Sequence, residues 1–165
     1  MKLNTMNLFR LIWCRNGSTP QHLNTSTAQR PNGSTDNPML IATFRDLDAW
    51  KAAHDLVLAV YRLPRKFPKD EMFGVTSQVR RSATSIPANI AEGFGRQGPK
   101  EFLRFIRIAN GSLQETEYFL FLAKDLSYLI PEEYSSSTEL SDRTGALLGG
   151  LQRSLKNQSE KTGGS

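Results

Sequence analysis

Hydrophobic and polar side chains follow a helical period from residue 44 to residue 156. The hydrophobic positions recur three and four residues apart, which places them on one face of an α-helix. In the first segment they are Leu47, Trp50, His54, Val57, Tyr61 and Pro64. Asp46 is placed to cap the start of this segment, and Pro64 with Pro68 ends it. We therefore expect a first helix that buries this stripe.

A second segment has its stripe at Val79, Ala83, Ile86, Ile90 and Phe94. Asp70 and Glu71 suit the positive N-terminus of this helix, and Gly93 suits a left-handed cap after its end. Pro87 lies inside the segment and removes a backbone donor, which frees the carbonyl of Ala83. The sequence predicts a helix with a kink at this proline.

The third and fourth segments keep a heptad pattern typical of bundled helices. The third has its stripe at Phe102, Ile106, Ala109, Leu113, Thr116, Leu120 and Ala123. The fourth has its stripe at Leu140, Thr144, Leu147, Leu151 and Leu155. We expect the fourth helix to start at Pro131, because proline is favoured at the first helical position. Residues 135–137 and the pair at 149–150, which are serines and glycines, weaken it.

No segment alternates in the manner of a strand, and the turns between the four helical segments are short. The sequence thus predicts an all-α protein, an antiparallel up-down four-helix bundle over residues 44–156. We expect residues 1–43 to form a disordered N-terminal extension, because Asn16 to Pro38 is almost entirely polar. Residues 157–165 are expected to be a disordered C-terminal tail. A signal peptide ending at Cys14 is disfavoured, because Arg10 interrupts the apolar stretch and no cleavage site follows.

Composition excludes several classes of protein. The chain has 165 residues and a single cysteine, Cys14, which rules out an internal disulfide and a Cys-rich zinc site. No apolar run approaches the roughly 20 residues that a membrane span needs, so we expect a cytoplasmic protein without membrane contact. Its formal net charge of +5 is compatible with a polyanionic partner.

The third helix carries hydrophobic residues outside its heptad stripe. They are Phe119, Phe121, Leu122, Leu126 and Leu129. A helix that is apolar on several sides is buried on several sides. Burial by a second copy of the chain predicts a homo-oligomer, and deeper burial within the monomer is the alternative.

Two motifs have competing interpretations. Residues Gly93, Gly95 and Gly98 match the spacing of a dinucleotide-binding loop, but a helix precedes them where that loop needs a strand, so nucleotide binding is disfavoured. Four polar residues line one flank of the second helix: Ser82, Ser85, Asn89 and Glu92. They could form a ligand face. The favoured alternative is that they bond to the freed backbone or to a neighbouring helix.

Basic residues gather around the turn between the second and third helices. They are Arg80, Arg81, Arg96, Lys100, Arg104 and Arg107. Such a patch would bind nucleic-acid phosphates without reading sequence. A solvated face with intrahelical pairs such as Glu101–Arg104 is the alternative.

The sequence offers little for catalysis. His54 lies on an apolar stripe with Asp55 beside it, which is typical of a core histidine. Glu92 and Glu115 lack a histidine three residues on, so the carboxylate metal site of helical bundles is not expected. We expect no catalytic residue, no metal and no cofactor.

Residues 73–93 read FGVTSQVRRSATSIPANIAEG, and EFLRF at 101–105 and ANGSLQE at 109–115 follow. These motifs resemble the "four helix bundle protein" family, which is encoded in intervening sequences of bacterial 23S ribosomal RNA genes. That family is related to the accessory variability determinant proteins of diversity-generating retroelements. The shared motif positions are Gln78, Arg80, Arg81, Ser85, Pro87, Asn89, Glu92 and Gly93.

The resemblance implies an antiparallel bundle that assembles into a homopentamer with a basic surface and no catalytic residues. For the retroelement relatives it implies binding of nucleic acid and of a reverse transcriptase. We interpret the shared positions as determinants of fold and assembly. The N-terminal extension and the Ser-rich opening of the fourth helix depart from the family pattern.

The leading hypothesis is a non-enzymatic homo-oligomer that binds structured RNA, or a complex of nucleic acid and protein, through the six basic residues. The alternative is a protein-interaction scaffold or accessory subunit, for example of a reverse transcriptase, without nucleic-acid affinity of its own.

Overall fold

The computed structural model describes residues 41–63, 67–96 and 98–162. Nearly all of the extension expected at 1–43, and the last three residues, lie outside these ranges. The described residues from Thr43 onward belong to one compact unit. It contains two short 3-10 helices, η2 (Phe44–Asp46) and η4 (Lys69–Met72), and four α-helices. These are α2 (Asp48–Arg62), α3 (Val75–Gly95), α4 (Pro99–Asp125) and α5 (Pro131–Thr162).

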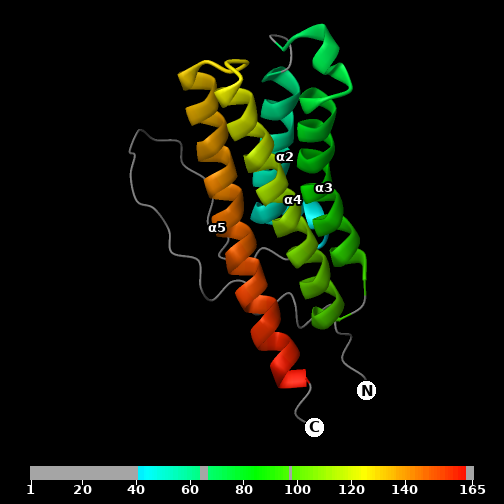
Figure 1. Ribbon diagram of the computed structural model, residues 1–165. Coiled ribbons are helices and arrows are strands. Elements are labelled where there is room, and N and C mark those ends of the chain that lie inside the picture. The colour runs from blue at the N-terminus through cyan, green and yellow to red at the C-terminus, as the bar shows by residue number, and fades with distance from the viewer. Residues whose placement is uncertain (1–40, 64–66, 97, 163–165) are drawn as a thin grey trace, which may run out of the picture. The chain divides into compact units, whose positions relative to one another are not determined.

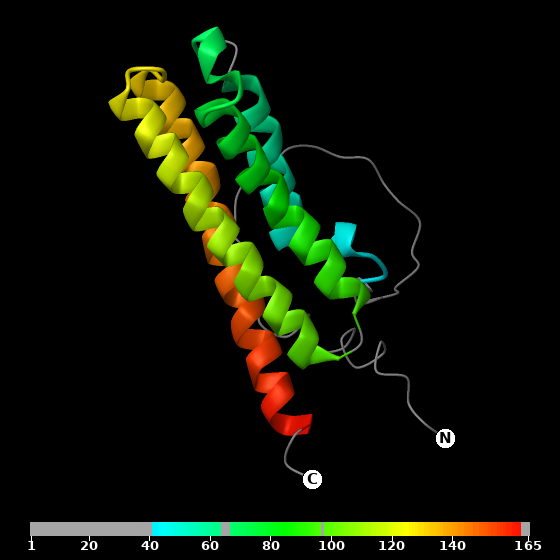
Figure 2. The same ribbon diagram turned by 45° about the vertical axis from the view of Figure 1, so that its right-hand side comes forward.

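The four α-helices form an antiparallel up-down bundle (Figures 1 and 2). Helix α2 packs against α3 and α5, and α4 packs against the same two helices. The described residues contain no strand. The all-α four-helix bundle predicted from the sequence is therefore confirmed.

The predicted stripe is correct for α4 and largely correct for α3. All seven stripe residues of α4 are buried, and in α3 only Phe94 is partly exposed. Helix α3 runs unbroken through Pro87, so the proline does not end it.

The predicted stripe of the first helix is correct at Leu47 and Val57 and wrong at His54 and Tyr61. Its buried face consists of small and medium residues, Ala49, Ala52, Ala53, Leu56, Val57 and Val60. His54 is exposed and stacks on Trp50, with ring centroids 5.0 Å apart, so it is not a core histidine. Tyr61 is 48% exposed. The alanines let neighbouring helices approach closely, and the bulkier aromatic residues fit only on the outside.

We expected Asp46 to cap the first helix and Glu71 to lie at the N-terminus of the second; the structure differs at Asp46 and agrees at Glu71. Asp46 belongs to η2, where its carboxylate accepts a hydrogen bond from the backbone of Thr43 at 2.8 Å, so it does not cap α2. Glu71 belongs to η4, yet its carboxylate accepts a 2.9 Å hydrogen bond from the backbone N–H of Val75, the first residue of α3.

Gly93 is a buried helical residue of α3, so the predicted left-handed cap is wrong. A Cβ at this position would lie 2.6 Å from Cβ of Phe105 and 2.7 Å from Cδ2 of Phe102. The glycine is needed because α3 and α4 approach each other there without room for a side chain. The left-handed glycine of this region is Gly98, with φ at 93°.

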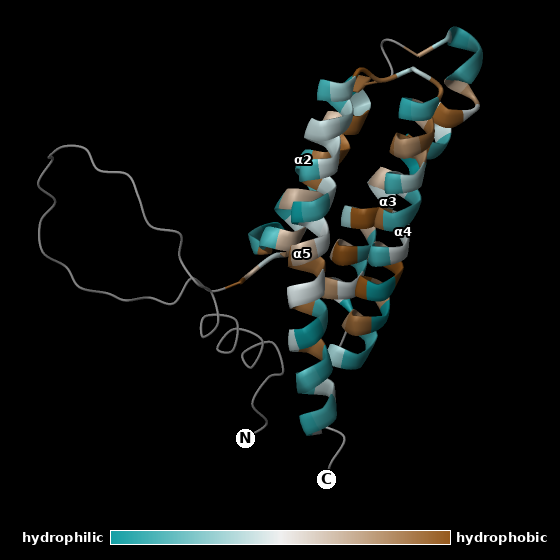
Figure 3. Cartoon of the chain, turned by 60° about the vertical axis from the view of Figure 1, so that its left-hand side comes forward, coloured by the Kyte–Doolittle hydropathy of each residue, from teal (hydrophilic) through white to brown (hydrophobic). Residues whose placement is uncertain are grey.

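Helix α5 starts at Pro131, as predicted, and continues to Thr162, beyond the expected end at 156. Its serine-rich start is helical, and the hydroxyls of Ser136, Ser137 and Thr138 donate hydrogen bonds to carbonyls four residues earlier. Its C-terminal turns are predominantly hydrophilic (Figure 3). Leu148 is fully buried on the core face, whereas Leu147 of the predicted stripe is only partly buried.

Candidate nucleic-acid interface

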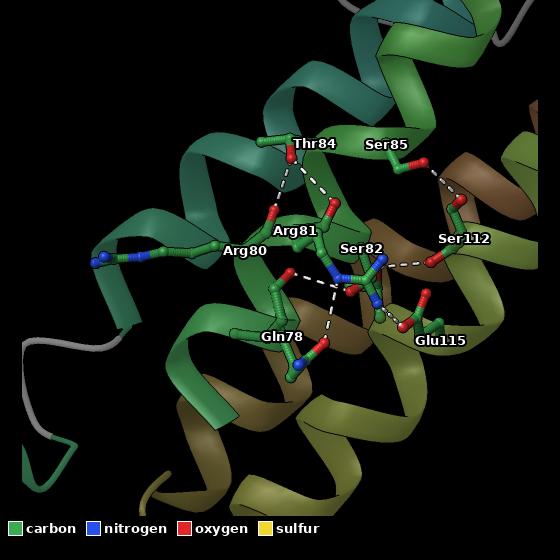
Figure 4. Close-up of polar contacts among 10 residues, drawn as sticks. Gln78, Arg80, Arg81, Ser82, Thr84, Ser85, Ser112 and Glu115 are labelled. Atoms are coloured by element: carbon green, nitrogen blue, oxygen red, sulfur yellow. Dashed lines mark hydrogen bonds and ion pairs between the residues drawn. The ribbon is translucent and has the colours of Figure 1, made fainter. Parts of the chain in front are cut away.

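A ladder of hydroxyl groups joins α3 to α4 (Figure 4). Ser112 donates a hydrogen bond to Ser85 at 2.9 Å, and Thr116 lies in hydrogen-bond contact with Ser82 at 3.0 Å. Ser82 and Thr116 are fully buried. The amide of Asn89 donates to the hydroxyl and carbonyl oxygens of Ser85. The structure therefore supports the interpretation that this polar flank bonds to a neighbouring helix and to its own backbone.

Arg80 and Arg81 point to opposite sides of α3 (Figure 4). Arg81 forms an ion pair with Glu115 of α4. The Nε of Arg81 also donates a 3.2 Å hydrogen bond to the side-chain oxygen of Gln78. The guanidinium of Arg80 lies 4.9 Å from the ring centroid of Tyr61 on α2. Two neighbouring arginines are thus engaged with two different helices, and the structure does not bring them together as one patch.

Most shared motif positions therefore face neighbouring parts of the bundle. Arg81 and Ser85 contact α4 directly, Gln78 and Asn89 bond to these two residues within α3, and Gly93 allows the close approach of α4. Pro87 is buried, and Glu92 bonds to Arg96 at the end of α3. This distribution supports the interpretation of the motif as a determinant of fold.

Arg96 and Arg104 meet around one aromatic ring at the α3–α4 turn. Their guanidinium carbons lie 5.5 Å and 5.8 Å from the ring centroid of Phe105. Arg96 also pairs with Glu92 at 2.6 Å. The hydrogen bond and the negative charge of Glu92 raise the pKa of Arg96. Arg104 lies 3.6 Å from Glu101 in a looser, exposed pair.

The exposed face of α4 is basic in its first half and aromatic in its second half. Lys100, Arg104 and Arg107 are spaced four and three residues apart, so they share one face. Within the described part of the chain, Lys100 and Arg107 have no acidic partner at ion-pair distance. The same face continues to Tyr118 and Phe121, which are 58% and 47% exposed.

A second exposed apolar region lies at the opposite end of the bundle from this basic face. The connections from α2 to α3 and from α4 to α5 meet there (Figures 1 and 2). The hydroxyl of Tyr128 donates a 3.2 Å hydrogen bond to Glu71 across the two connections. The exposed residues are Met72, Phe73, Leu126 and Ile130, with Phe73 at 89%. We call these four residues the apolar end.

Sequence analysis missed Ser112 and the role of Glu115, and it placed Thr116 in the apolar stripe without its hydrogen bonds. Ser112 and Glu115 directly precede stripe residues of the third segment, which is the signal that the sequence offers. That signal does not say which neighbouring helix these side chains contact.

The described residues show no cluster of three or more histidine, cysteine, aspartate or glutamate side chains close enough to hold a metal ion. Cys14 and His22 lie outside the described ranges. None of the helices among the described residues has the length and hydrophobicity that crossing a bilayer requires.

Comparison with known proteins identifies relatives of the bundle. A family model described as 23S rRNA-intervening sequence protein matches residues 45–150. A crystal structure of a protein with unknown function from the S23 ribosomal protein family, from Bacteroides thetaiotaomicron, is 28% identical with a TM-score of 0.59. The match covers 63% of this chain and 97% of that chain. No curated protein is significantly similar to this chain.

Proposed function

The chain belongs to the 23S rRNA-intervening sequence protein family, and from this premise we propose that it is a non-enzymatic, homo-oligomeric RNA-binding protein of the cytoplasm. Structured RNA, or a complex of RNA and protein, is the expected partner. The proposal assigns no catalytic residue and no cofactor.

The basic half of the exposed face of α4 carries this proposal. Lys100, Arg104 and Arg107 project from one helical face, and two of them have no internal acidic partner among the described residues. Cations that are not neutralised by the protein remain available to replace counterions on a phosphate backbone. Arg96, next to Phe105, extends this face. We assign Arg80 and Arg81 a smaller share, because Arg80 already contacts the ring of Tyr61 and Arg81 already pairs with Glu115.

The exposed apolar residues support the oligomer. Of the five hydrophobic residues outside the α4 heptad, Leu129 is buried within the monomer, whereas Phe121 and Leu126 are 47% and 44% exposed. Ile108 and Tyr118 of the same helix are also exposed. A second copy of the chain would cover these side chains. The pentamer implied by the family resemblance is the assembly that we expect, and native mass spectrometry measures it.

Fluorescence anisotropy with a structured RNA and with duplex DNA, at about 50 and 200 mM salt, tests RNA binding. We compare the double variant R104A/R107A with a matched variant, R143A/R153A, which removes two exposed arginines from α5. Loss of two phosphate contacts should lower the magnitude of the slope of log K against log salt by about two. The matched variant should bind almost as the natural protein does.

Equal losses in both double variants would show that net charge alone attracts the RNA, and the basic face of α4 would have no special role. Unchanged binding in R104A/R107A would refute the assignment of these residues.

The apolar end favours a second candidate function, a scaffold or accessory subunit that docks a protein such as a reverse transcriptase. Phe73 is almost fully exposed, and the two connections at this end of the bundle expose three further apolar residues. A pull-down after nuclease treatment distinguishes the two functions. Partners that survive digestion and are lost in F73S would favour the scaffold.

A further inference from the structure

A small acidic hollow opens between α4 and α5, on residues that the proposed function does not use. It has a volume of about 170 Å³. Glu117 and Leu120 line it from α4, and Tyr134, Thr138, Ser141 and Asp142 line it from α5. Leu120 is buried, Glu117 is partly buried and Asp142 is exposed.

Ser141 is unusual among the hydroxyl residues of α5. Ser137, Thr138 and Thr144 each donate a hydrogen bond to the carbonyl oxygen four residues earlier. Ser141 is only 1% exposed, yet its Oγ has no hydrogen-bond partner among the described residues. A buried hydroxyl without a partner is costly, and native structures rarely keep one without a reason. This hydroxyl lines the hollow, so a ligand there could satisfy it.

The two carboxylates of the hollow are not neutralised by the described part of the bundle. No lysine or arginine of the described residues lies at ion-pair distance from Glu117 or Asp142. Burial and the nearby charge of Asp142 raise the pKa of Glu117, while a hydrogen bond from Gln114 opposes that shift. The ammonium group of Lys124 lies over the rings of Phe121 and Tyr134, at 5.3 Å and 5.1 Å from their centroids, and pairs with neither carboxylate. The hollow therefore combines negative charge with an unused acceptor.

We propose that this hollow binds a guanidinium group carried on a short alkyl chain. A guanidinium is planar and has five N–H donors, which suits two carboxylates and one hydroxyl oxygen arranged around a small space. Leu120 provides apolar surface for the alkyl chain. The group can come from an arginine side chain of a second copy of this protein or from a free alkylguanidine.

Ligand-observed NMR titration of the full-length protein with n-butylguanidinium tests the site. We expect saturable binding that D142N and E117Q each weaken by about tenfold or more, since a hydrogen bond to a charged group is lost. The matched control is E139Q, which removes an exposed carboxylate of α5 outside the hollow and should change affinity by less than about twofold.

The variant S141A tests whether the hydroxyl of Ser141 binds the ligand or stabilises the fold. If Oγ serves the ligand, its removal should weaken butylguanidinium binding while raising the Tm of the free protein, because an unsatisfied buried group is removed. A fall in Tm with unchanged probe binding would overturn the role of Ser141.

Sedimentation velocity distinguishes the two sources. If a second copy supplies an arginine, D142N and an excess of butylguanidinium should each dissociate the assembly. If the ligand is a free alkylguanidine, the assembly should stay intact while the probe binds. The proposal is overturned if D142N leaves both probe binding and assembly unchanged. These outcomes do not depend on RNA binding, so the site can fail while the proposed function stands.

Discussion

The close approach of α3 and α4 at Gly93 gives a sharp prediction for the variant G93A. The new Cβ would lie 2.6 Å from Cβ of Phe105 and 2.7 Å from the ring of Phe102. Both aromatic residues are buried, and a Cβ atom cannot swing away as the end of a flexible side chain can. The two helices must therefore separate, because rotating the rings would leave the contact with the Cβ of Phe105 in place.

Two opposing effects set the magnitude. Overpacking of a tight core costs about 1–3 kcal/mol, whereas alanine is more favourable than glycine in a helix by about 0.5–1 kcal/mol. The net result should be a loss of about 1–2 kcal/mol, which corresponds to a fall in Tm of roughly 4–8 °C for a bundle of this size.

Gly111 provides the matched control. It lies inside α4, is exposed, and a Cβ there meets no atom within 4 Å. G111A should therefore show the helix preference alone and raise Tm by about 2–4 °C. Thermal unfolding followed by circular dichroism, at one protein concentration for all variants, measures both changes. A G93A protein as stable as G111A would refute the described contact between the helices.

Two further predictions concern buried polar contacts. T116V removes the hydroxyl that contacts Ser82 at 3.0 Å and the carbonyl of Ser112 at 2.8 Å. It should cost about 1–2 kcal/mol in urea unfolding, and adding S82A should cost less than the sum of the single changes; additive losses would contradict the described ladder. Desolvation and the hydrogen bond to Glu71 raise the pKa of Tyr128. Because the folded state holds this proton more tightly, Tyr128 should stabilise the fold below pH 10 and lose that contribution as pH rises through its folded pKa. Y128F should therefore lose less stability than the natural protein above pH 10, and parallel pH profiles would refute this.

The number and order of the helices could be predicted because α4 and α3 carry their large apolar residues on one face, and these residues form the core. The buried face of α2 could be predicted only in part. Half of its buried residues are alanines, Ala49, Ala52 and Ala53, whose small side chains contribute little to a hydrophobic pattern. The larger Trp50 and Tyr61 dominate that pattern, yet Trp50 is only partly buried and Tyr61 is exposed.

The basic patch could be predicted only in part. Arg80 and Arg81 are adjacent in sequence, but successive residues of a helix point about 100° apart, and here they contact α2 and α4 respectively. The spacing of Lys100, Arg104 and Arg107 predicts a shared face, because it matches the helical period. The acidic hollow between α4 and α5 could not be predicted from the sequence. Its residues come from two helices, and the sequence does not specify which sides of these helices face each other.

The order of helices around the bundle has a consequence for how the chain folds. Three of the four contacts between neighbouring helices join segments that follow one another in sequence, and only the contact of α2 with α5 joins the two ends of the domain. The connection between α3 and α4 spans only residues 96–98, so little chain entropy is lost when this pair forms. During synthesis the hairpin of α3 and α4 can therefore assemble as soon as residue 125 has left the ribosome. The pairing of α2 with α5 must wait for the last helix, so it is the step that completes folding.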